Sequence, residues 1–319
     1  MTYAVVIPNH LPHLDFLKEW GELEDAQLIV VQDGPEAPEA PEGAPPNIRV
    51  YTWDDIDADL GAHSWIIPRK TSAVRSYGYL KAYEAGVDVI LTLDNDCYPD
   101  GSPWIQGHQR NLGAVAALDW VTSTPDIPYT RGFPYRIRDL SPVVLSHGLW
   151  SGVPDLDAAT SLHMPDLRLD PARGVQVVPR HSFFPVCGMN LAWRREITPA
   201  LYFGIFGPEY GFDQYDDIWA GVLVKRVLDH LGLAAVTGAP SVEHRKQSDV
   251  FANIRKQAPG LEMNENFWIA VRHVPLTATT VLDTYEELIV GLPDVIEGEP
   301  KGWTRLFKDA AQVWVGRFR

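Results

Sequence analysis

The chain has 319 residues, of which 45% are hydrophobic and 22% are charged, a composition typical of a globular protein with a substantial core. Its formal net charge of −15 argues against nucleic acid as a main partner, because nucleic-acid-binding proteins must neutralise phosphates. Two cysteines, Cys97 and Cys187, provide neither a disulfide framework nor a four-thiolate zinc site. With no apolar stretch as long as a membrane span and no secretory leader, we expect a cytoplasmic protein without an integral membrane segment.

Apolar runs and helical patterns alternate over the first hundred residues. Strands are predicted at 3–7, 27–32, 48–51 and 89–93, and helices at 14–20 and 73–85. A loop rich in proline, alanine and glutamate, 35–46, separates the second and third strands. Repeated strand–helix–strand units predict a parallel sheet with right-handed crossovers.

Beyond residue 96 the pattern loosens into short elements. The strongest helix is predicted at 215–231, with Asp216 and Asp217 in its first turn and Gly232 at its end. A short strand at 234–237 and helical patterns near 285–289 and 303–314 follow. We therefore predict an α/β catalytic domain, 1–257, with a helical C-terminal extension, 258–319, packed on it.

The run Asp94-Asn95-Asp96 directly follows the predicted strand 89–93. Ligands of open α/β sheets bind at the carboxyl ends of strands, and carboxylate oxygens suit Mg²⁺ or Mn²⁺. Such a cation would hold a diphosphate that the acids cannot hold directly. Acids at strand ends also commonly cap turns, so the motif by itself leaves both interpretations open. The sequence contains neither Gly-x-Gly-x-x-Gly after the first strand nor a Gly-Lys-Ser/Thr loop, which excludes the usual dinucleotide and triphosphate-hydrolase sites.

Several runs are not explained by helical or strand periodicity. They include Val186-Cys187-Gly188-Met189-Asn190-Leu191-Ala192, Tyr215-Asp216-Asp217-Ile218-Trp219-Ala220-Gly221, Asp229-His230-Leu231-Gly232-Leu233 and Arg131-Gly132-Phe133-Pro134. With Ser146-His147-Gly148-Leu149-Trp150 and Asp94-Asn95-Asp96-Cys97, these runs closely resemble the reversibly glycosylated polypeptides, the UDP-arabinopyranose mutases best known from plants. The resemblance runs from Ile7 to about Gln257, and the C-terminal sixty residues match only loosely.

This resemblance implies a glycosyltransferase-A type, Rossmann-like fold for a nucleotide-diphospho-sugar. It further implies a UDP-sugar substrate, Mn²⁺ or Mg²⁺ but no flavin, and assembly into homo-oligomers. The implied reaction interconverts the pyranose and furanose forms of UDP-L-arabinose. In the family an arginine of the Arg-Gly-aromatic-Pro motif becomes glycosylated, here Arg131, and a second arginine, here Arg138, is also required. This chain departs from the family in having Asn95 where the family has a third aspartate, and in residues 135–137.

The metal site implied by the family consists of Asp94, Asp96 and His244. A lone histidine such as His244 is more often an ordinary polar residue, and the resemblance is what favours ligation. Beside it, Arg245 and Lys246 could hold the diphosphate, Arg245 as a bidentate donor and Lys246 as a point charge. The alternative for this pair is a solvated basic turn.

Three further residues are candidates for binding the nucleotide, namely Asp33, Arg75 and Asn95. Asp33 ends the second predicted strand and could accept hydrogen bonds from a uracil or ribose, or could form an Asx turn with Gly34. Arg75 opens the helix after the third strand and could reach a base or phosphate, or could be a solvated helix residue. Asn95 is included as the middle residue of the acidic motif.

Asp216 and Asp217 are candidate catalytic residues at the start of the strongest helix. In the implied architecture, acids at this position contact sugar hydroxyls or act as a base. The alternative is a helix cap and a first-turn acid favoured by the helix dipole. Trp219 and Tyr215 would suit a sugar face but could equally be core residues.

The mechanism that we expect follows from the chemistry of ring size. While UDP occupies C1 the sugar ring cannot open, so the C1–O–phosphate bond must break and re-form. Arg131 would attack C1 or anchor the sugar, and Arg138 and Lys246 would assist the departing UDP. Two alternatives remain, a metal-dependent glycosyltransferase acting on an external acceptor and a non-catalytic, self-glycosylated scaffold that binds nucleotide sugars.

Overall fold

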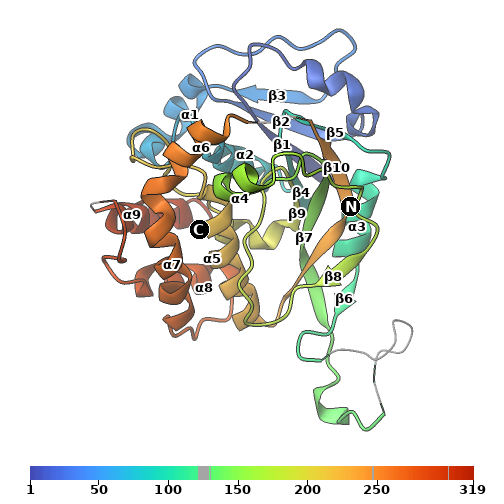
Figure 1. The fold of residues 1–319 in the computed structure, drawn as a ribbon, viewed down its shortest axis with the longest axis vertical. Helices are drawn as coiled ribbons and strands as arrows, with labels where there is room; N and C mark the ends of the chain where they lie inside the picture. The colour runs from blue at the N-terminus through green and yellow to red at the C-terminus, as the bar shows by residue number, and fades with distance from the viewer. Residues whose placement is uncertain (121–128, 130, 246–247, 301) are drawn as a thin grey trace.

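The computed structural model describes residues 1–120, 129, 131–245, 248–300 and 302–319. A single large sheet forms the centre of the molecule, with strand order β3-β2-β1-β4-β9-β7-β10-β5 (Figure 1). The strands are β1 Tyr3–Asn9, β2 Gln27–Gln32, β3 Ile48–Tyr51, β4 Val89–Leu93, β5 Cys97–Pro99, β6 Val115–Ala116, β7 Ser141–Gly152, β8 Val175–Val177, β9 Asn190–Arg194 and β10 Ala234–His244. The α-helices are α1 Trp53–Leu60, α2 Arg75–Glu84, α3 Trp104–Leu112, α4 Ala158–His163, α5 Asp216–Leu231, α6 Val250–Gln257, α7 Leu261–His273, α8 Val281–Gly291 and α9 Trp303–Gly316.

The N-terminal half of the sheet is parallel, as predicted. β1 pairs in parallel with β2 and with β4, and β2 pairs in parallel with β3. The bounds of β2, β3 and β4 are those expected from their apolar runs, because buried parallel strands are apolar on both faces. The predicted helix at 73–85 is α2, preceded by one 3₁₀ turn, Ser72–Val74. The predicted α/β class with a Rossmann-like parallel half is confirmed, in agreement with a glycosyltransferase-A type fold.

The C-terminal half of the sheet differs from a simple parallel arrangement. β9 runs antiparallel to both β4 and β7 and joins the two halves. β7 is a strand of 12 residues in a region where we expected only short elements. Ser146, His147 and Gly148 interrupt its apolar pattern, and Gly148 is required because a Cβ there would lie 2.2 Å from the Asn190 Nδ2 atom. Long-range pairing, rather than local periodicity, therefore defines β7.

Helices cover both faces of the sheet (Figure 1). One face packs against α3 and the N-terminal 3₁₀ turn Asp15–Glu19, in a hydrophobic cluster that contains Trp20 and Trp104. The other face packs against α2, α5 and the C-terminal helices in a larger cluster. α5 ends at Gly232 in the left-handed conformation, at the end predicted for this helix.

The predicted helical character of residues 258–319 is observed in α7, α8 and α9. Trp219 of α5 stacks on Phe267 of α7 at 4.5 Å between ring centroids and meets Trp303 of α9 edge-on at 5.1 Å. The indole N–H of Trp303 donates to the Ile205 carbonyl at 2.8 Å. Trp219 is therefore a core residue rather than a sugar-stacking surface, and so is Tyr215, which is 4% exposed. The boundary at residue 257 stays a prediction, although both parts share one hydrophobic cluster.

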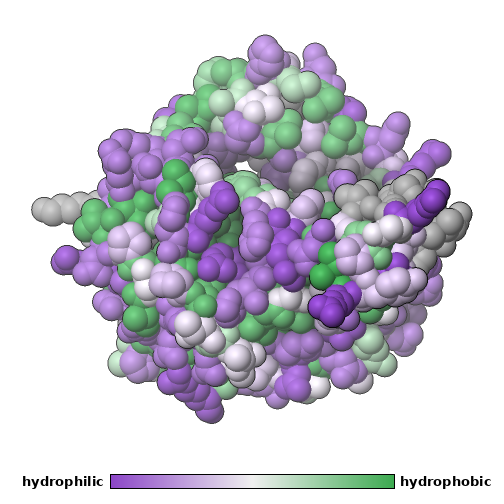
Figure 2. Space-filling model, turned by 90° about the horizontal axis from the view of Figure 1, so that it is seen from below, coloured by the Kyte–Doolittle hydropathy of each residue, from purple (hydrophilic) through white to green (hydrophobic). Residues whose placement is uncertain are grey.

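Within the described ranges, the helices lack the combination of length and apolar character that a membrane crossing requires. The face seen from below mixes hydrophilic and hydrophobic residues (Figure 2).

Candidate active site

Most of the predicted site residues lie at one edge of the sheet. The carboxyl ends of β2, β4, β7 and β10 meet there, and they carry Asp33, Asp94, the segment 153–155 and His244. Because β9 is antiparallel, its N-terminal end lies at the same edge and brings the turn Cys187–Met189 beside Asp94. This edge is where ligands of open α/β sheets bind.

Asp94 is held by a buried arginine. The Arg75 guanidinium, 2% exposed, donates from Nη2 to Asp94 Oδ1 at 2.6 Å. It also donates from Nη1 to the Gly188 carbonyl at 2.5 Å and from Nε to the Ser72 carbonyl at 3.0 Å. Burial raises the pKa of Asp94 and Arg75 opposes this rise. Arg75 is therefore a buried residue that binds the acidic motif, and it is not a solvated helix residue. Its predicted contact with a base or phosphate of the nucleotide stays a prediction.

Asn95 points into the protein. Its side-chain N–H donates to Asn9 Oδ1 at 2.7 Å, and Asn9 in turn donates to Gln32 Oε1 at 2.7 Å. This buried amide chain ties the turn after β4 to the ends of β1 and β2. The two outer carboxylates of the motif, on Asp94 and Asp96, are each 25% exposed at the side chain and remain available to a ligand.

His244 closes the acidic motif from β10. Its Nε2 atom lies 3.8 Å from Asp96 Oδ2, and its Nδ1 atom lies 2.9 Å from the Val153 carbonyl. A carbonyl can only accept, so Nδ1 carries the proton and Nε2 is left with its lone pair in the neutral imidazole. Two atoms that each bind one Mg²⁺ at about 2.1 Å can be up to about 4.2 Å apart, so the separation suits a shared cation.

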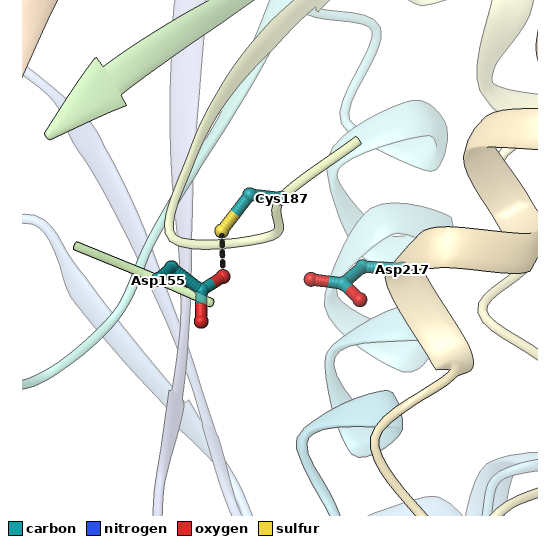
Figure 3. A group of neighbouring side chains, drawn as sticks. All are labelled: Asp155, Cys187 and Asp217. Carbon is teal, nitrogen blue, oxygen red and sulfur yellow. Dashed lines mark hydrogen bonds between the residues drawn. The ribbon is translucent and has the colours of Figure 1, made fainter. Parts of the chain in front are cut away.

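A second group of side chains adjoins the first. Asp217 in it was predicted as a catalytic residue, whereas Asp155 and Cys187 were not predicted as site residues. Ligand atoms of Asp155, Cys187 and Asp217 all lie within 4.8 Å of one another. They come from the segment after β7, the turn before β9 and the first turn of α5, and they point toward one another (Figure 3). The Cys187 thiol donates to Asp155 Oδ2 at 2.9 Å, and the Gly188 N–H donates to Asp217 Oδ2 at 2.9 Å. An acid three residues beyond the end of β7 was the available signal, and it was missed because β7 itself was missed.

The acids at this sheet edge raise one another's pKa values. Burial raises the pKa of Asp217 well above its ordinary value, with further increases from Asp216 and Asp155. Burial also raises the pKa of Asp216 to about 6, although its carboxylate accepts a hydrogen bond from the Ser72 hydroxyl at 2.6 Å. Neither acid is the N-cap, which is Tyr215, but Asp217 Oδ1 accepts a hydrogen bond from the Ile218 N–H in the first turn at 2.8 Å, so a helix-start role and a site role coexist.

Two predicted phosphate or nucleotide contacts have internal partners in the structure. Asp33 Oδ1 accepts hydrogen bonds from the Trp53 indole at 3.0 Å and from the Lys70 backbone N–H at 2.8 Å. Arg245 pairs with Glu19 and Glu243 at 2.9 and 2.8 Å and lies 3.9 Å over the Tyr98 ring. Lys246 lies outside the described residues.

A pocket of about 210 Å³ opens beside His244 and Asp155. Its wall is formed by the segment after β7, α4 and α6, and includes Val153, Leu162, Met164 and Arg168. Sites for small molecules usually have about 300–1,000 Å³, so this pocket is large enough for a sugar or one side chain but not for a whole nucleotide sugar.

Comparison with known proteins decides the family. The family model described as "Reversibly glycosylated polypeptide" matches residues 2–316. The chain belongs to the reversibly glycosylated polypeptide family. The match covers the C-terminal helices as well, so it extends well beyond the limit near Gln257 that we expected.

Curated members of the family include plant proteins named as mutases. The chain is 36% identical to probable UDP-arabinopyranose mutase 1 of Solanum tuberosum over 98% of this chain and 88% of that protein. It is 36% identical to UDP-arabinopyranose mutase 1 of Arabidopsis thaliana over 89% of this chain and 83% of that protein. The crystal structure of A197 from STIV covers 78% of this chain and 87% of that chain, with 12% identity and a TM-score of 0.34, too low to carry an argument.

In this member of the family the two motif arginines lie away from the acids. Arg131 and Arg138 precede β7, whereas Asp155 follows it and His244 pairs with Gly152 at its far end. A strand of 12 residues spans roughly 35 Å, so Arg131 and the acidic edge lie at opposite ends of one long strand. Arg131 is exposed, and the Arg138 guanidinium donates to the Phe133 carbonyl at 2.7 Å and lies 3.8 Å over the Tyr135 ring. The structure brings together the acids and His244 but not these arginines.

Proposed function

We propose that the protein is a metal-dependent UDP-sugar mutase that interconverts UDP-L-arabinopyranose and UDP-L-arabinofuranose. The observation that carries this proposal is the gathering of Asp94, Asp96, Asp155, Asp217 and His244 at one sheet edge, beside a pocket of sugar size. The names of plant relatives that align over most of the chain support the choice of reaction.

The order of the strands supports a path for the substrate along this edge. Asp33 ends β2 and Asp94 ends β4, with β1 between them, a separation of roughly 10 Å across the sheet. A nucleoside near Asp33 would direct its diphosphate toward Asp94 and Asp96. The sugar would then lie toward Asp155 and Asp217, where carboxylates can accept hydrogen bonds from its hydroxyls.

Asp94, Asp96 and His244 are the residues that would hold Mn²⁺ or Mg²⁺. Two carboxylates and an imidazole suit these cations, and the buried Arg75 fixes the first carboxylate in place. A cation bound there would neutralise the charge of the departing diphosphate.

The proposed reaction requires two exchanges of bonds at C1. The C1–O bond to UDP would break with its electron pair leaving on UDP, while a nitrogen of Arg131, which lies away from the acidic edge of its own chain, bonds to C1 and passes its proton to a carboxylate. The C1–O5 bond then opens, with the nitrogen lone pair forming C=N and O5 taking a proton. O4 adds to C1 and loses its proton, and the C=N electron pair returns to the nitrogen. A UDP oxygen then bonds to C1 as the C1–N bond breaks, and the arginine nitrogen takes its proton back from the carboxylic acid. Buried acids such as Asp216 and Asp217, with raised pKa values, suit these proton transfers near neutral pH.

The direct test incubates the protein with UDP-L-arabinopyranose and Mn²⁺ and resolves pyranose from furanose products. We expect furanose to form, and we expect Asp96→Asn to reduce turnover at least 100-fold. Asp309→Asn, a change at an exposed acid of α9, is the matched control and should leave turnover within a factor of two. Absence of furanose from the unaltered protein would contradict the proposal.

Removal of the cation provides a second expected outcome. Chelation of divalent metal should abolish turnover, and added Mn²⁺ should restore it. Formation of a sugar–acceptor product without furanose would instead favour the glycosyltransferase alternative. Binding of UDP-sugar without turnover would favour the scaffold.

We also propose a cytoplasmic location and a homo-oligomeric state. The two cysteines are both unpaired and buried, as expected of a protein in a reducing compartment.

A further inference from the structure

The segment Arg131–Leu140, which we call the arginine arm, is unlike the rest of this acidic molecule. It contains three arginines, Arg131, Arg136 and Arg138, against one acid, Asp139, in a chain with a net charge of −15. In Figure 1 it projects below β6 and the N-terminal end of β7. A positively charged projection on a negatively charged protein is complementary to the protein's own acidic surfaces.

The arginine arm also exposes large apolar side chains. Tyr135 is 85% exposed, Ile137 52% and Leu140 41%. Contacts with Tyr129, just before the arm, hold Arg138 in place. The Arg138 guanidinium lies 4.6 Å over the Tyr129 ring, and the Tyr129 hydroxyl donates to the Arg138 carbonyl at 2.7 Å. Tyrosine and arginine are the residues enriched where protein surfaces bind each other, so the arm has the composition of a contact surface.

A surface of complementary character lies beyond the other end of β7. The pocket there presents the exposed Asp155, and exposed apolar side chains, Leu162 at 48% and Met164 at 44%, form part of its wall together with a cation, Arg168. Asp94, Asp96 and Asp217 add negative charge behind the pocket. Asp94 and Asp96 raise the pKa of Asp155, and Asp155 raises the pKa of Asp217. The pocket volume of about 210 Å³ accepts one long side chain from the arm, and the sugar would then lie outside it, between Asp155 and Asp217.

One copy cannot bring these two surfaces together. The 12 residues of β7, paired with β9 and β10, hold the arm and the pocket roughly 35 Å apart. Two copies placed antiparallel about a two-fold axis would place each arm at the pocket of the other copy. Such an isologous arrangement closes on itself and satisfies both pairs of surfaces.

We propose that the arginine arm of one copy docks at the pocket beside Asp155 of a second copy, so that each active site includes Arg131 from its partner. The docking is inferred from the opposite charges of the arm and the pocket, from their exposed apolar residues and from the length of β7. Only the chemical role of Arg131 rests on the proposed mutase function.

The first experiment measures oligomeric state and does not depend on activity. Light scattering during gel filtration should give a dimer for the unaltered protein, and Tyr135→Ala with Arg136→Glu should shift it to a monomer at the same concentration. Arg272→Glu, a charge reversal at an exposed position of α7, is the control and should remain a dimer. An unaltered protein that is monomeric, or a dimer that survives the arm substitutions, would overturn the docking.

The second experiment asks which copy supplies Arg131. Arg131→Ala removes the arm residue and leaves the acids intact, whereas Asp96→Asn does the reverse. Each variant alone should be at least 100-fold less active than the unaltered protein. After exchange of subunits, half of the dimers contain one copy of each variant, and each has one complete site, so activity should return to about a quarter.

A mixture that stays inactive, although differently tagged copies are shown to exchange, would mean that Arg131 serves its own chain and would overturn the proposal. If the proposed mutase function is wrong, these experiments give a different result. In that case the unaltered protein would form no furanose, while the arm substitutions would still dissociate the dimer.

Discussion

At the scale of single residues, the middle of the acidic motif has a structural task distinct from that of its neighbours. Asn95 donates to Asn9 Oδ1, and Asn9 uses its own N–H groups on Gln32 and on the Leu11 carbonyl. The outer acids, each 25% exposed at the side chain, face the site. Asn95 therefore explains how the chain can depart from the three-aspartate pattern without losing the two carboxylates that would hold a metal.

We expect Asn95→Asp to destabilise the protein. A carboxylate at this position would face the Asn9 oxygen, and turning the Asn9 amide would leave the buried Gln32 Oε1 atom without the donor it has now. Loss of a buried hydrogen bond of this kind costs about 1–3 kcal/mol, to be measured as the free energy of unfolding in urea. Adding Asn9→Thr supplies a hydroxyl donor and should recover part of the loss. Unchanged stability in Asn95→Asp would contradict the role of the amide chain.

His108 gives stability a dependence on pH. Its ring lies between Ser146 Oγ at 2.9 Å and Asn190 Oδ1 at 2.8 Å, and burial lowers its pKa to about 4. The unfolded chain binds a proton near pH 6.5 and the folded chain does not, so this contribution is present above pH 6.5 and is lost as the pH falls toward 4. The shift corresponds to about 3 kcal/mol.

His108→Gln removes this titration and is the variant that measures it. Between pH 7.5 and 4, the free energy of unfolding should fall by about 3 kcal/mol more in the unaltered protein than in the variant. Parallel curves for the two proteins would show that His108 is not buried in its neutral form.

At the scale of elements, the contact between α5 and the turn before β9 sets the position of the acids. Gly221 allows this contact, because a Cβ there would lie 2.3 Å from the Val186 backbone nitrogen and 2.9 Å from the Phe184 carbonyl oxygen. The same helix carries Asp217, and the same turn carries Cys187. A shift between the two would therefore alter the group that contains Asp155.

Gly221→Ala should lower the free energy of unfolding by about 1–3 kcal/mol, since neither backbone segment can yield easily. It should also weaken binding of UDP-sugar, measured by calorimetry, because Asp217 moves with α5. Gly316→Ala, at the end of α9 with no atom within 4 Å of the added carbon, is the control and should change stability by less than about 0.5 kcal/mol. A tolerated Gly221→Ala would show that α5 and the turn can separate without loss.

At the scale of the whole molecule, the C-terminal helices and the catalytic part share one core. Met263, Phe267, Trp303 and Trp314 are all 3% exposed or less and belong to the same hydrophobic cluster as α2 and α5. Two separable units would each need a core of their own. The C-terminal helices therefore complete the fold rather than decorate it.

Calorimetry of the full chain should show one cooperative heat transition. A chain ending at residue 257 exposes the faces of Trp219 and Phe206 that α7 and α9 cover, so it should show no transition and should precipitate. Two resolved transitions, or a folded fragment, would contradict the single core and support a domain boundary at 257.

Local sequence patterns were enough to predict the parallel half of the sheet, the strongest helix and the place of the acidic motif. Buried parallel strands are continuous apolar runs, and α5 has a clear C-terminal signal at Gly232, so local patterns suffice for both. Motif resemblance then led to the family, which the match over residues 2–316 established.

Which side chains meet depends on how the elements pack in three dimensions. β7 depends on partners distant in sequence, and without it neither the approach of Asp155 to Asp217 nor the remoteness of Arg131 could be predicted. Local patterns also could not predict that Asn95 points inward or that Arg75 is buried. Their hydrogen-bond partners lie 86 and 19 residues away in the sequence and leave no local pattern. Local periodicity reports which face of an element is buried, whereas the composition of a site depends on how the elements pack.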